Sequence, residues 1–461
     1  MDCDHAVACR YNPAMQISRR FLLLLSAWLL DACASGPQRP APPVIDQTAA
    51  FSAEFPGDPA EPQIAGRWWR TAVSGEVWPR LEQALSANPE LREANAQIAA
   101  AEARLIQAEA DTGPELDLRA DARAVKDGGD TTNRRSIGVD GRLPLDVSGA
   151  LADRVEAARA QLVASVADAD QLRSDLARDF LFALIDSAEA AQRVALLERQ
   201  IEVSKTLLRL TELRFTQGLT SSVDVLQQRD ELAALRQQIP FALLERKIAT
   251  NALRRIAALT PDRPAPLLLD ILPPIKSDFP RIQPLDLLHR RASLRASQAR
   301  IEAADARFAA ALADRWPSVA LSSEVVTRAI SGDVSTLIAA AIDATLTLFD
   351  GERKVAIAAE RRAQLVAAGE QYLSDWFETV IEVDDLMHAE ASLQERIVLS
   401  EQRLRTVDTL LTAARRRYER GVSDYLPVLA ALRGQQQQQR DHLALQAALA
   451  RSRVRLHRAL G

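Results

Sequence analysis

Cysteine and histidine are scarce in this chain of 461 residues, which limits the chemistry available to it. The three cysteines, Cys3, Cys9 and Cys33, all lie near the start, so the remainder has no disulfide and no cysteine-based metal site. The five histidines are scattered singly and form no HxH or HExxH spacing. No P-loop, catalytic-triad order or paired-carboxylate pattern stands out either. We therefore expect no enzyme, no catalytic residue and no metal site.

Long apolar runs and an excess of positive charge are also missing. The formal net charge is −5, which argues against a nucleic acid or an anionic membrane surface as a partner. Beyond the first residues, no run approaches the roughly 18 consecutive apolar residues of a membrane helix. Any part of the chain that crosses a membrane is therefore expected to be β-structure, because lipid tolerates only helices and closed sheets.

The segment "RRFLLLLSAWLLDACASG", residues 19–36, is typical of a bacterial export signal. Two arginines precede a ten-residue apolar run at 21–30. That run is too short to span a bilayer but has the length of a signal-peptide core. The sequence therefore predicts an exported protein.

The last four residues of this signal, 30–33 ("LDAC"), are similar to a bacterial lipobox. Asp31 departs from the pattern, in which a small or apolar residue is usual. We expect residues 1–32 to be the signal peptide and Cys33 to bear a covalent lipid, the one attached group expected. A plain cleaved signal is the alternative, and Met15 is an alternative start of translation. No aspartate follows the cysteine, which favours sorting to the outer membrane.

The segment after the signal is rich in proline, alanine and glutamine. We expect residues 33–63 to form an extended tether from the anchor. Ordered sequence is expected from residue 64, where Trp68, Trp69 and Trp78 are predicted to pack as a small cap.

An internal duplication is the strongest feature of the chain. Three pairs of segments match: "ADTGPELDL" (110–118) with "ADRWPSVAL" (313–321), "RVEAARAQL" (154–162) with "IAAERRAQL" (357–365), and "RFTQGLTSSVDVL" (214–226) with "RYERGVSDYLPVL" (417–429). All three pairs are offset by 203 positions, which chance would rarely produce. We expect two repeats, at 64–258 and 285–461, joined by a proline-rich link at 259–284.

Each repeat contains two segments in which apolar and polar residues alternate. This period of two predicts strands with one apolar and one charged face. The segments are 115–125, 136–146, 318–328 and 335–350, with turns expected near 126–133 and 329–333. The charged face of the first strand consists of Asp117, Arg119, Asp121 and Arg123. Such lengths suit tilted membrane strands, and an ordinary half-buried sheet is the alternative.

Two very long helices follow the strand pairs. Neither proline nor glycine occurs for 68 residues between Gly149 and Gly218, and only Gly369 interrupts the stretch from Gly351 to Gly421. A helix of that length measures about 100 Å, which exceeds any globular core, so we expect coiled coils. Each long helix ends at a glycine and a second helix returns, which predicts two equivalent hairpin tips.

Two details of the returning helices are also predicted. Pro240 is expected to bend the first of them. The glutamine run at 435–439, in the second, is expected to be solvated helix surface without a binding role.

Together, the lipobox, the "NPEL" first helix, the strand pairs, the long helices and the duplicated tip motif resemble the outer-membrane factors of tripartite efflux pumps. These are the TolC-like channels, and the chain is most similar to the lipoprotein branch that serves resistance-nodulation-division transporters. The resemblance implies a mainly helical fold with a membrane β part. Three chains would share a twelve-stranded β-barrel and a helical tunnel. The implied function is passive exit of small molecules through the outer membrane of a Gram-negative bacterium.

The resemblance also implies the partners. An inner-membrane transporter supplies the energy, and a periplasmic adaptor grips the hairpin tips. The adaptor-facing residues implied by motif position are Arg214, Gly218, Leu219, Ser222, Arg417, Gly421, Val422 and Ser423.

Members of this family close the tunnel near the second tip, where aspartates ring the opening. Ala430 stands here where that aspartate is expected, whereas Leu426 keeps the apolar constriction position. Asp424 is the candidate replacement, with an exposed turn aspartate as its alternative. Asp224 is the acidic candidate in the first repeat.

Two other functions compete with an efflux duct. A structural coiled-coil lipoprotein of the periplasm would explain the helices and the anchor but not four alternating strands. The outer-membrane duct of a type I protein secretion system would use the same architecture, although the lipoprotein leader favours small-molecule efflux.

Overall fold

The computed structural model describes residues 38–45, 48–53, 67–73, 75–127, 130–330 and 333–461. The predicted signal peptide and Cys33 lie outside the described residues, as do parts of the tether. Among the helices within these ranges, none is both long and apolar enough to cross a membrane.

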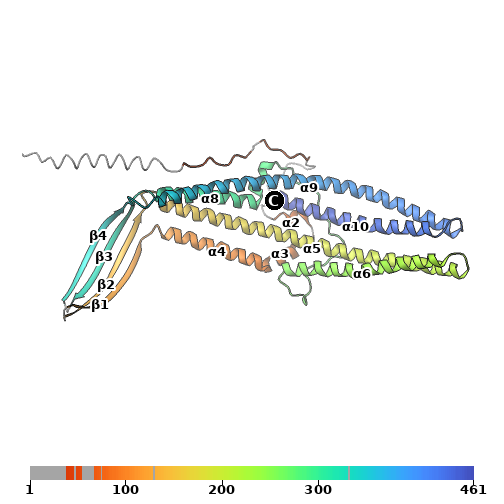
Figure 1. Cartoon of the computed structure of the whole chain (residues 1–461), viewed down its shortest axis with the longest axis horizontal. Helices are drawn as coiled ribbons and strands as arrows, with labels where there is room; N and C mark the ends of the chain where they lie inside the picture. Colours follow the sequence, from red (N-terminus) through yellow and green to blue (C-terminus); the bar gives the residue numbers. More distant parts are fainter. Residues whose placement is uncertain (1–37, 46–47, 54–66, 74, 128–129, 331–332) are drawn as a thin grey trace, which may run out of the picture. The chain divides into compact units, whose positions relative to one another are not determined.

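The chain consists of one series of elements that occurs twice (Figure 1). The first series is α4 (Pro89–Ala110), β1 (Glu115–Asp127), β2 (Asp130–Leu145), α5 (Ala150–Thr216) and α6 (Ser222–Ile256). The second is α8 (Ala292–Ala313), β3 (Ser318–Ile330), β4 (Asp333–Thr345), α9 (Arg353–Glu419) and α10 (Leu426–Leu460). Short helices precede each series: α2 (Trp69–Ala72) and α3 (Val77–Ala87) in the first, η1 (Pro284–Asp286) and α7 (Leu287–Arg290) in the second.

Matching helices have equal lengths, which confirms the predicted duplication and the mainly helical fold. The pair α4 and α8 has 22 residues each, α5 and α9 have 67 each, and α6 and α10 have 35 each. A 67-residue helix is about 100 Å long at 1.5 Å per residue.

Contacts divide the chain into two compact units, and both long helices pass through both of them. Unit 1 contains the described residues of 38–43, 101–162 and 299–371, and therefore all four strands. Unit 2 contains the described residues of 44–100, 163–298 and 372–461, and therefore both hairpin tips.

The strands of unit 1 form one antiparallel sheet in the order β1-β2-β3-β4 (Figure 1). The register places Leu118 opposite Val139, which pairs with Val325 and then Ile338, so one face is apolar across all four strands. The neighbouring row places Asp117 opposite Asp140 and then Glu324, so the other face is charged. The predicted apolar face is thus continuous across all four strands, whereas the charged row ends at β3, because Ala339 of β4 lies opposite Glu324.

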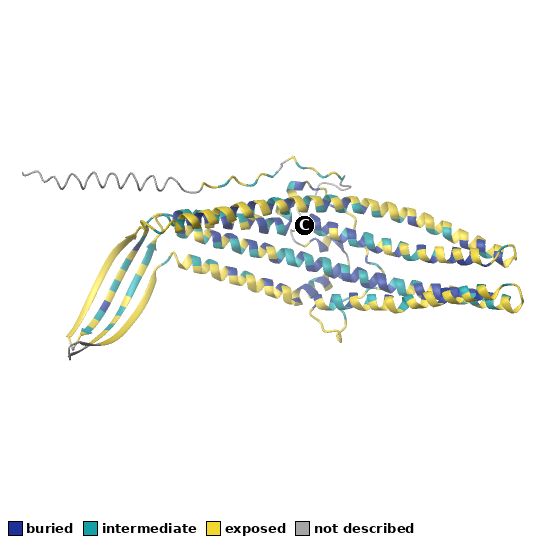
Figure 2. Ribbon diagram, viewed as in Figure 1, coloured by how far each residue is buried: buried dark blue, intermediate teal, exposed yellow. Residues whose placement is uncertain are grey.

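The outer strands β1 and β4 each pair on one side only. Every residue of β4 is exposed in the single chain, whereas Ala320 and Val326 of β3 are buried (Figure 2). The backbone N–H and C=O groups along both outer edges therefore lack strand partners within the described chain.

One face of α5 is buried through small side chains. Ala157, Ala160, Ala164 and Ala167 of α5 are buried at alternating spacings of three and four. Arg154 of α5 donates two hydrogen bonds from Nη2 to Asp314, at 2.6 and 2.8 Å, and thereby joins α5 to the end of α8. The alternating spacing of three and four among the buried alanines is the one expected for a coiled-coil seam.

The main core of unit 2 joins the first short helices to the middle of α5. Trp68 and Trp69 are buried there, and the Trp68 indole donates to Ser174 Oγ at 2.8 Å. The predicted tryptophan cap is wrong for Trp78, which is 36% exposed and lies under the guanidinium of Arg70. Trp78 lies on the exposed face of α3, so its side chain stays outside the core.

The predicted proline-rich link packs against this core as extended chain. Ile275 is buried in this core, Phe279 is buried in a second cluster of unit 2, and the Lys276 N–H donates to the carbonyl of Ala72 at 3.0 Å. Farther upstream, Ser52 in the described part of the tether donates to Asp384 of α9 at 2.6 Å.

Two predictions about local structure need correction. The turn expected at 126–133 is largely strand, because the ladder continues until Asp127 pairs with Asp130. The glutamine run is not simply solvated surface, because Gln436 and Gln438 are 2% and 4% exposed. Gln436 lies four residues after Leu432, on the same buried stripe of α10.

Helix α6 continues through Pro240 from Ser222 to Ile256. A proline inside a helix removes one backbone hydrogen bond without necessarily ending the helix. The bend expected there stays a prediction.

Candidate interaction site at the two hairpin tips

Both long helices end in the same backbone motif. Gly218 and Gly421 have φ values of +73° and +72°, in the left-handed region that glycine adopts without strain. The Leu219 N–H donates to the Arg214 carbonyl at 2.8 Å, and the Val422 N–H donates to the Arg417 carbonyl at 2.9 Å. These are the bonds of a Schellman motif, so each glycine ends its helix in the same way.

The two tips differ in how the returning helix begins. Ser221 caps α6 by accepting from the Asp224 N–H at 3.2 Å, and Asp224 accepts in return from the Ser221 N–H at 3.1 Å. Helix α10 has no such side-chain cap and contains Pro427 in its first turn. By the 203-residue offset, Pro427 occupies the place of Asp224.

The first gate candidate, Asp224, is held by this cap. Thr220 Oγ1 and Ser221 Oγ donate to its carboxylate at 2.6 and 2.9 Å. Partial burial alone would raise the pKa of Asp224, but these hydrogen bonds outweigh it and leave the pKa below its usual value. The carboxylate is therefore charged at neutral pH and positioned by its own turn.

The candidates at the second tip lie on the surface. Asp424 is exposed in the turn before α10, and Leu426 is 60% exposed in its first turn. Their role at a closure remains a prediction, because closure would involve further copies of the chain.

Most of the predicted adaptor-facing residues are exposed. Leu219 is 61% exposed and Val422 is 65% exposed, so each tip presents one apolar side chain beside its glycine. Gly218, Ser222, Arg417 and Gly421 are also exposed. Arg214 differs from Arg417, because its guanidinium lies 4.3 Å from the centre of the Tyr418 ring and donates to the Tyr418 carbonyl at 3.3 Å. Ser423 is half-buried, and its hydroxyl has no partner among the described residues.

The two hairpins contact each other through residues that the sequence did not single out. Tyr418 and Tyr425 pack edge to face with ring centres 5.4 Å apart, and Tyr425 is 1% exposed. The Tyr425 hydroxyl donates to Oε1 of Gln228 on α6. Burial, with a smaller contribution from Tyr418, holds the pKa of Tyr425 above its usual value, so the phenol remains a neutral donor.

Farther from the tips, polar pairs continue along the contact between the hairpins. Arg433 of α10 donates to Glu231 of α6. Arg451 of α10 donates to Asp186 and Glu189 of α5 at 2.6 and 2.5 Å. The chain has four tyrosines, and two of them, Tyr418 and Tyr425, lie at one tip. This clustering was the signal in the sequence that could have indicated the contact.

The charged face of the sheet contains both signs. Arg119 lies 3.1 Å from Asp140, and Arg328 lies 3.4 Å from Glu324. Within the described ranges, no group of three or more His, Cys, Asp or Glu side chains is placed to bind a metal ion.

A family model described as "Outer membrane efflux protein" matches residues 80–259 and 284–461. The chain belongs to the outer membrane efflux protein family. The two matched segments coincide with the two structural series, so the duplication is a property of the family model as well.

Relatives of this outer membrane efflux protein match along nearly their whole length. The pyoverdine export outer membrane protein OpmQ of Pseudomonas putida is 25% identical, over 97% of this chain and 98% of its own. The outer membrane protein OprJ of Pseudomonas aeruginosa is 27% identical, over 92% of this chain and 90% of its own.

A solved structure of the outer-membrane channel OprN has the same fold. It superposes with a TM-score of 0.83 at 25% identity, over 93% of this chain and 99% of that one. The protein described here is accordingly an efflux channel of the outer membrane. Its sheet and hairpins are parts of a duct, and the comparisons identify it with channels rather than with enzymes.

Proposed function

We propose that three copies of this protein form a passive exit duct for small molecules. A periplasmic adaptor engages the hairpin tips, and an inner-membrane transporter of the resistance-nodulation-division class drives the transport. A lipid on Cys33 anchors each copy to the outer membrane.

The observation that supports assembly most directly is the sheet with two unpaired edges. Four strands cannot close on themselves, and lipid does not tolerate open edges because unpaired backbone groups there cost several kcal/mol each. Three copies would pair β1 of one chain with β4 of the next and close a twelve-stranded sheet. The apolar face would then meet lipid and the charged face would line the water-filled passage.

The tips support the proposed adaptor contact. Each tip combines an exposed apolar residue, Leu219 or Val422, with an exposed glycine turn. A partner helix could approach closely at such a turn, because glycine has no side chain to keep it away. Two tips of matching backbone in each chain offer a repeated surface for a repeated partner.

Assembly and conductance are tested together on the purified mature chain in detergent. We expect a mass of three chains and ion-conducting steps after insertion into planar bilayers. A monomer that conducts no ions would overturn the duct and would favour a structural periplasmic lipoprotein.

The cargo and the anchor are tested in cells. Deletion of the gene should sensitise the bacterium to some members of a toxic-compound panel, whereas loss of a secreted protein alone would indicate a type I secretion duct. Replacing Cys33 with alanine should abolish incorporation of labelled palmitate. Incorporation that persists in C33A would overturn the proposed site of lipidation.

A further inference from the structure

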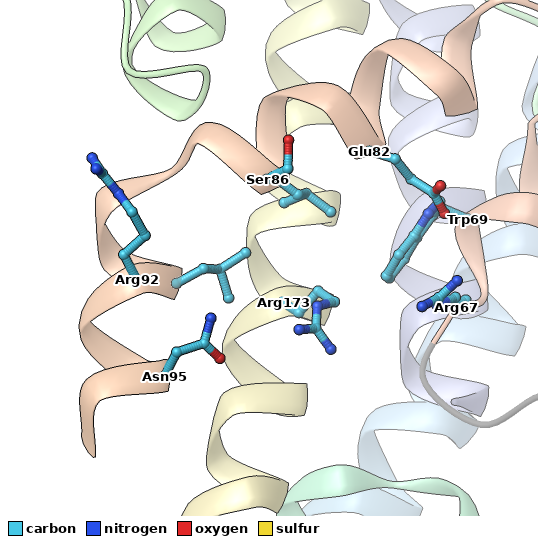
Figure 3. A pocket seen from close by; sticks show the side chains of 9 residues that line it. Arg67, Trp69, Glu82, Ser86, Arg92, Asn95 and Arg173 are labelled. Carbon is cyan, nitrogen blue, oxygen red and sulfur yellow. The ribbon is translucent and has the colours of Figure 1, made fainter. Parts of the chain in front are cut away.

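A small cleft in unit 2 is lined by several hydrogen-bond donors (Figure 3). It has a volume of about 260 Å³ and lies among the start of α2, the helix α3, the first turns of α4 and the middle of α5. Three arginines line it, namely Arg67, Arg92 and Arg173, together with Asn95 of α4. None of these residues belongs to the strands or to the hairpin tips.

The positive charge of the cleft is largely uncompensated. Neither Arg67 nor Arg92 forms an ion pair with any residue that the structure describes. Arg173 lies 3.1 Å from Asp170, whose carboxylate also pairs with Arg295 at 3.3 Å. Glu82 is the one acidic residue of the lining, and it forms an ion pair at 2.6 Å with Arg70, which is not a lining residue.

A buried donor in the same lining also lacks a partner. Trp69 is 1% exposed, and its indole N–H has no acceptor among the described residues. A buried donor without an acceptor costs about 1–3 kcal/mol, so an acceptor brought in by a ligand would remove a real penalty. In Figure 3, Arg67 and Arg173 lie beside Trp69, whereas the side chain of Arg92 extends away from it.

We propose that this cleft binds a small oxyanion, a phosphate or a carboxylate, between Arg67 and Arg173 and beside Trp69. Guanidinium groups bind the oxygens of both anions through paired, charge-assisted hydrogen bonds. The flexible arginine side chains would shift toward the anion, and one of its oxygens would accept from the Trp69 N–H. The bound anion would join the start of α2 to α5. Binding requires only a single chain and does not depend on the proposed assembly.

The test measures binding to the full chain in detergent, by calorimetry and by the shift in unfolding temperature. Inorganic phosphate is titrated at constant ionic strength against sodium chloride, and acetate is titrated in a parallel arm that distinguishes a phosphate ligand from a carboxylate. An anion that binds only the folded state raises the unfolding temperature. We expect at least one of the two anions to do so, beyond the effect of chloride.

Three variants locate the site. Arg67→Gln should weaken binding on the order of tenfold, because it removes one charge that has no other partner. Trp69→Phe keeps the ring and removes only the N–H, so it should weaken binding severalfold while leaving the anion-free protein at least as stable. Arg80→Gln is the matched control, since Arg80 lies on α3, its guanidinium donates to Gln83 of the same helix and it is not part of the lining.

Two results would overturn the proposal. One is an unfolding temperature that phosphate and acetate shift no more than chloride does. The other is equal binding by the Arg67→Gln and Arg80→Gln proteins, which would mean that the anions act at another place.

Discussion

At the scale of single residues, Asn88 connects two helices with one side-chain amide. Its Oδ1 accepts from the N–H groups of Glu90 and Leu91 at 2.8 and 3.2 Å, which caps α4. Its Nδ2 donates to the carbonyl of Ile256 at 2.9 Å, at the end of α6. Asn88 is 1% exposed, so water cannot replace either contact.

Replacing Asn88 with alanine should therefore destabilise the chain by about 2 kcal/mol, since both a helix cap and a buried hydrogen bond are lost. Thermal unfolding in detergent measures the effect. Asn88→Ser keeps a capping oxygen but is too short to donate to Ile256, and it should fall between the wild type and the alanine variant. Equal unfolding temperatures for all three proteins would contradict this account.

The two tyrosines at the second tip should respond differently to loss of the hydroxyl. Tyr425→Phe leaves the buried Oε1 of Gln228 without its donor and should cost about 1–3 kcal/mol. Tyr418→Phe is the matched control, because the Tyr418 hydroxyl has no partner among the described residues. We expect the control to match the wild type or to be slightly more stable. The reverse order would show that the described hydroxyl contact is not the important one.

The buried imidazole of His457 should make stability depend on pH. Burial, above all, lowers its pKa from the ordinary value of 6.5, although its Nε2 donates to the Lys276 carbonyl at 2.9 Å. The unfolded chain therefore takes up a proton near pH 6.5 that the folded chain refuses, and stability falls as the pH drops below that value.

The slope should be at most about 1.4 kcal/mol per pH unit for this one group. His457→Gln retains a donor for Lys276 but cannot titrate. Unfolding temperatures measured from pH 8 to pH 5 should therefore fall less steeply in His457→Gln than in the wild type. Parallel curves for the two proteins would exclude His457 as the source.

At the scale of the elements, the tip glycines end the long helices. Gly421→Ala forces a left-handed conformation on a residue with a Cβ atom and should cost about 1–2 kcal/mol. Gly434→Ala is the matched control inside α10, where no atom lies within 4 Å of the added Cβ. It should stabilise the helix by up to about 1 kcal/mol. Unfolding temperatures that move in the same direction in both variants would contradict the assignment of Gly421 as a helix terminator.

The elements themselves could largely be predicted from the sequence, because each has a strong local signal. Absence of proline, with Gly369 as the one glycine, predicted α5 and α9, and alternation of Leu118 with its charged neighbours predicted the two faces of the sheet. Polar composition led to wrong predictions for the turn at 126–133 and for the glutamine run, because strand pairing and helix packing decide the structure there. Asp127 and Asp130 are strand residues because the ladder continues to them, and Gln436 is buried because it follows Leu432 on one helix face.

The residues that join the hairpins could not be predicted in the same way. Tyr425 and Gln228 lie 197 positions apart, and neither has a local pattern that names the other as its partner. Arg214 and Arg417 occupy equivalent positions, yet only Arg214 lies against a tyrosine. Contacts between elements depend on how the helices pack, which a local pattern does not contain.

At the scale of the whole molecule, the two faces of β4 should differ in what they tolerate. Ile338 lies on the apolar face near the middle of a strand whose residues are all exposed in the single chain, and its neighbour Ala339 lies on the charged face. An arginine facing lipid near the middle of a bilayer costs about 2–4 kcal/mol. Ile338→Arg should therefore reduce the amount of assembled protein in the outer membrane, whereas Ala339→Arg should assemble normally.

The assembled fraction is measured by membrane fractionation followed by unheated gel electrophoresis. The contrast between these adjacent positions separates an effect of the face from a general effect of charge. Equal losses in both variants would mean that the apolar face does not contact lipid.

The equal lengths of the matching helices have a consequence for stoichiometry. Each chain presents two turns of the same backbone shape but of different chemistry, since only the first has a capping box and only the second has the paired tyrosines. On three copies, a partner that recognises the backbone shape alone would find six equivalent binding sites. A partner that recognises the tyrosines would find three binding sites. Counting the subunits of the bound partner would therefore reveal which property it recognises.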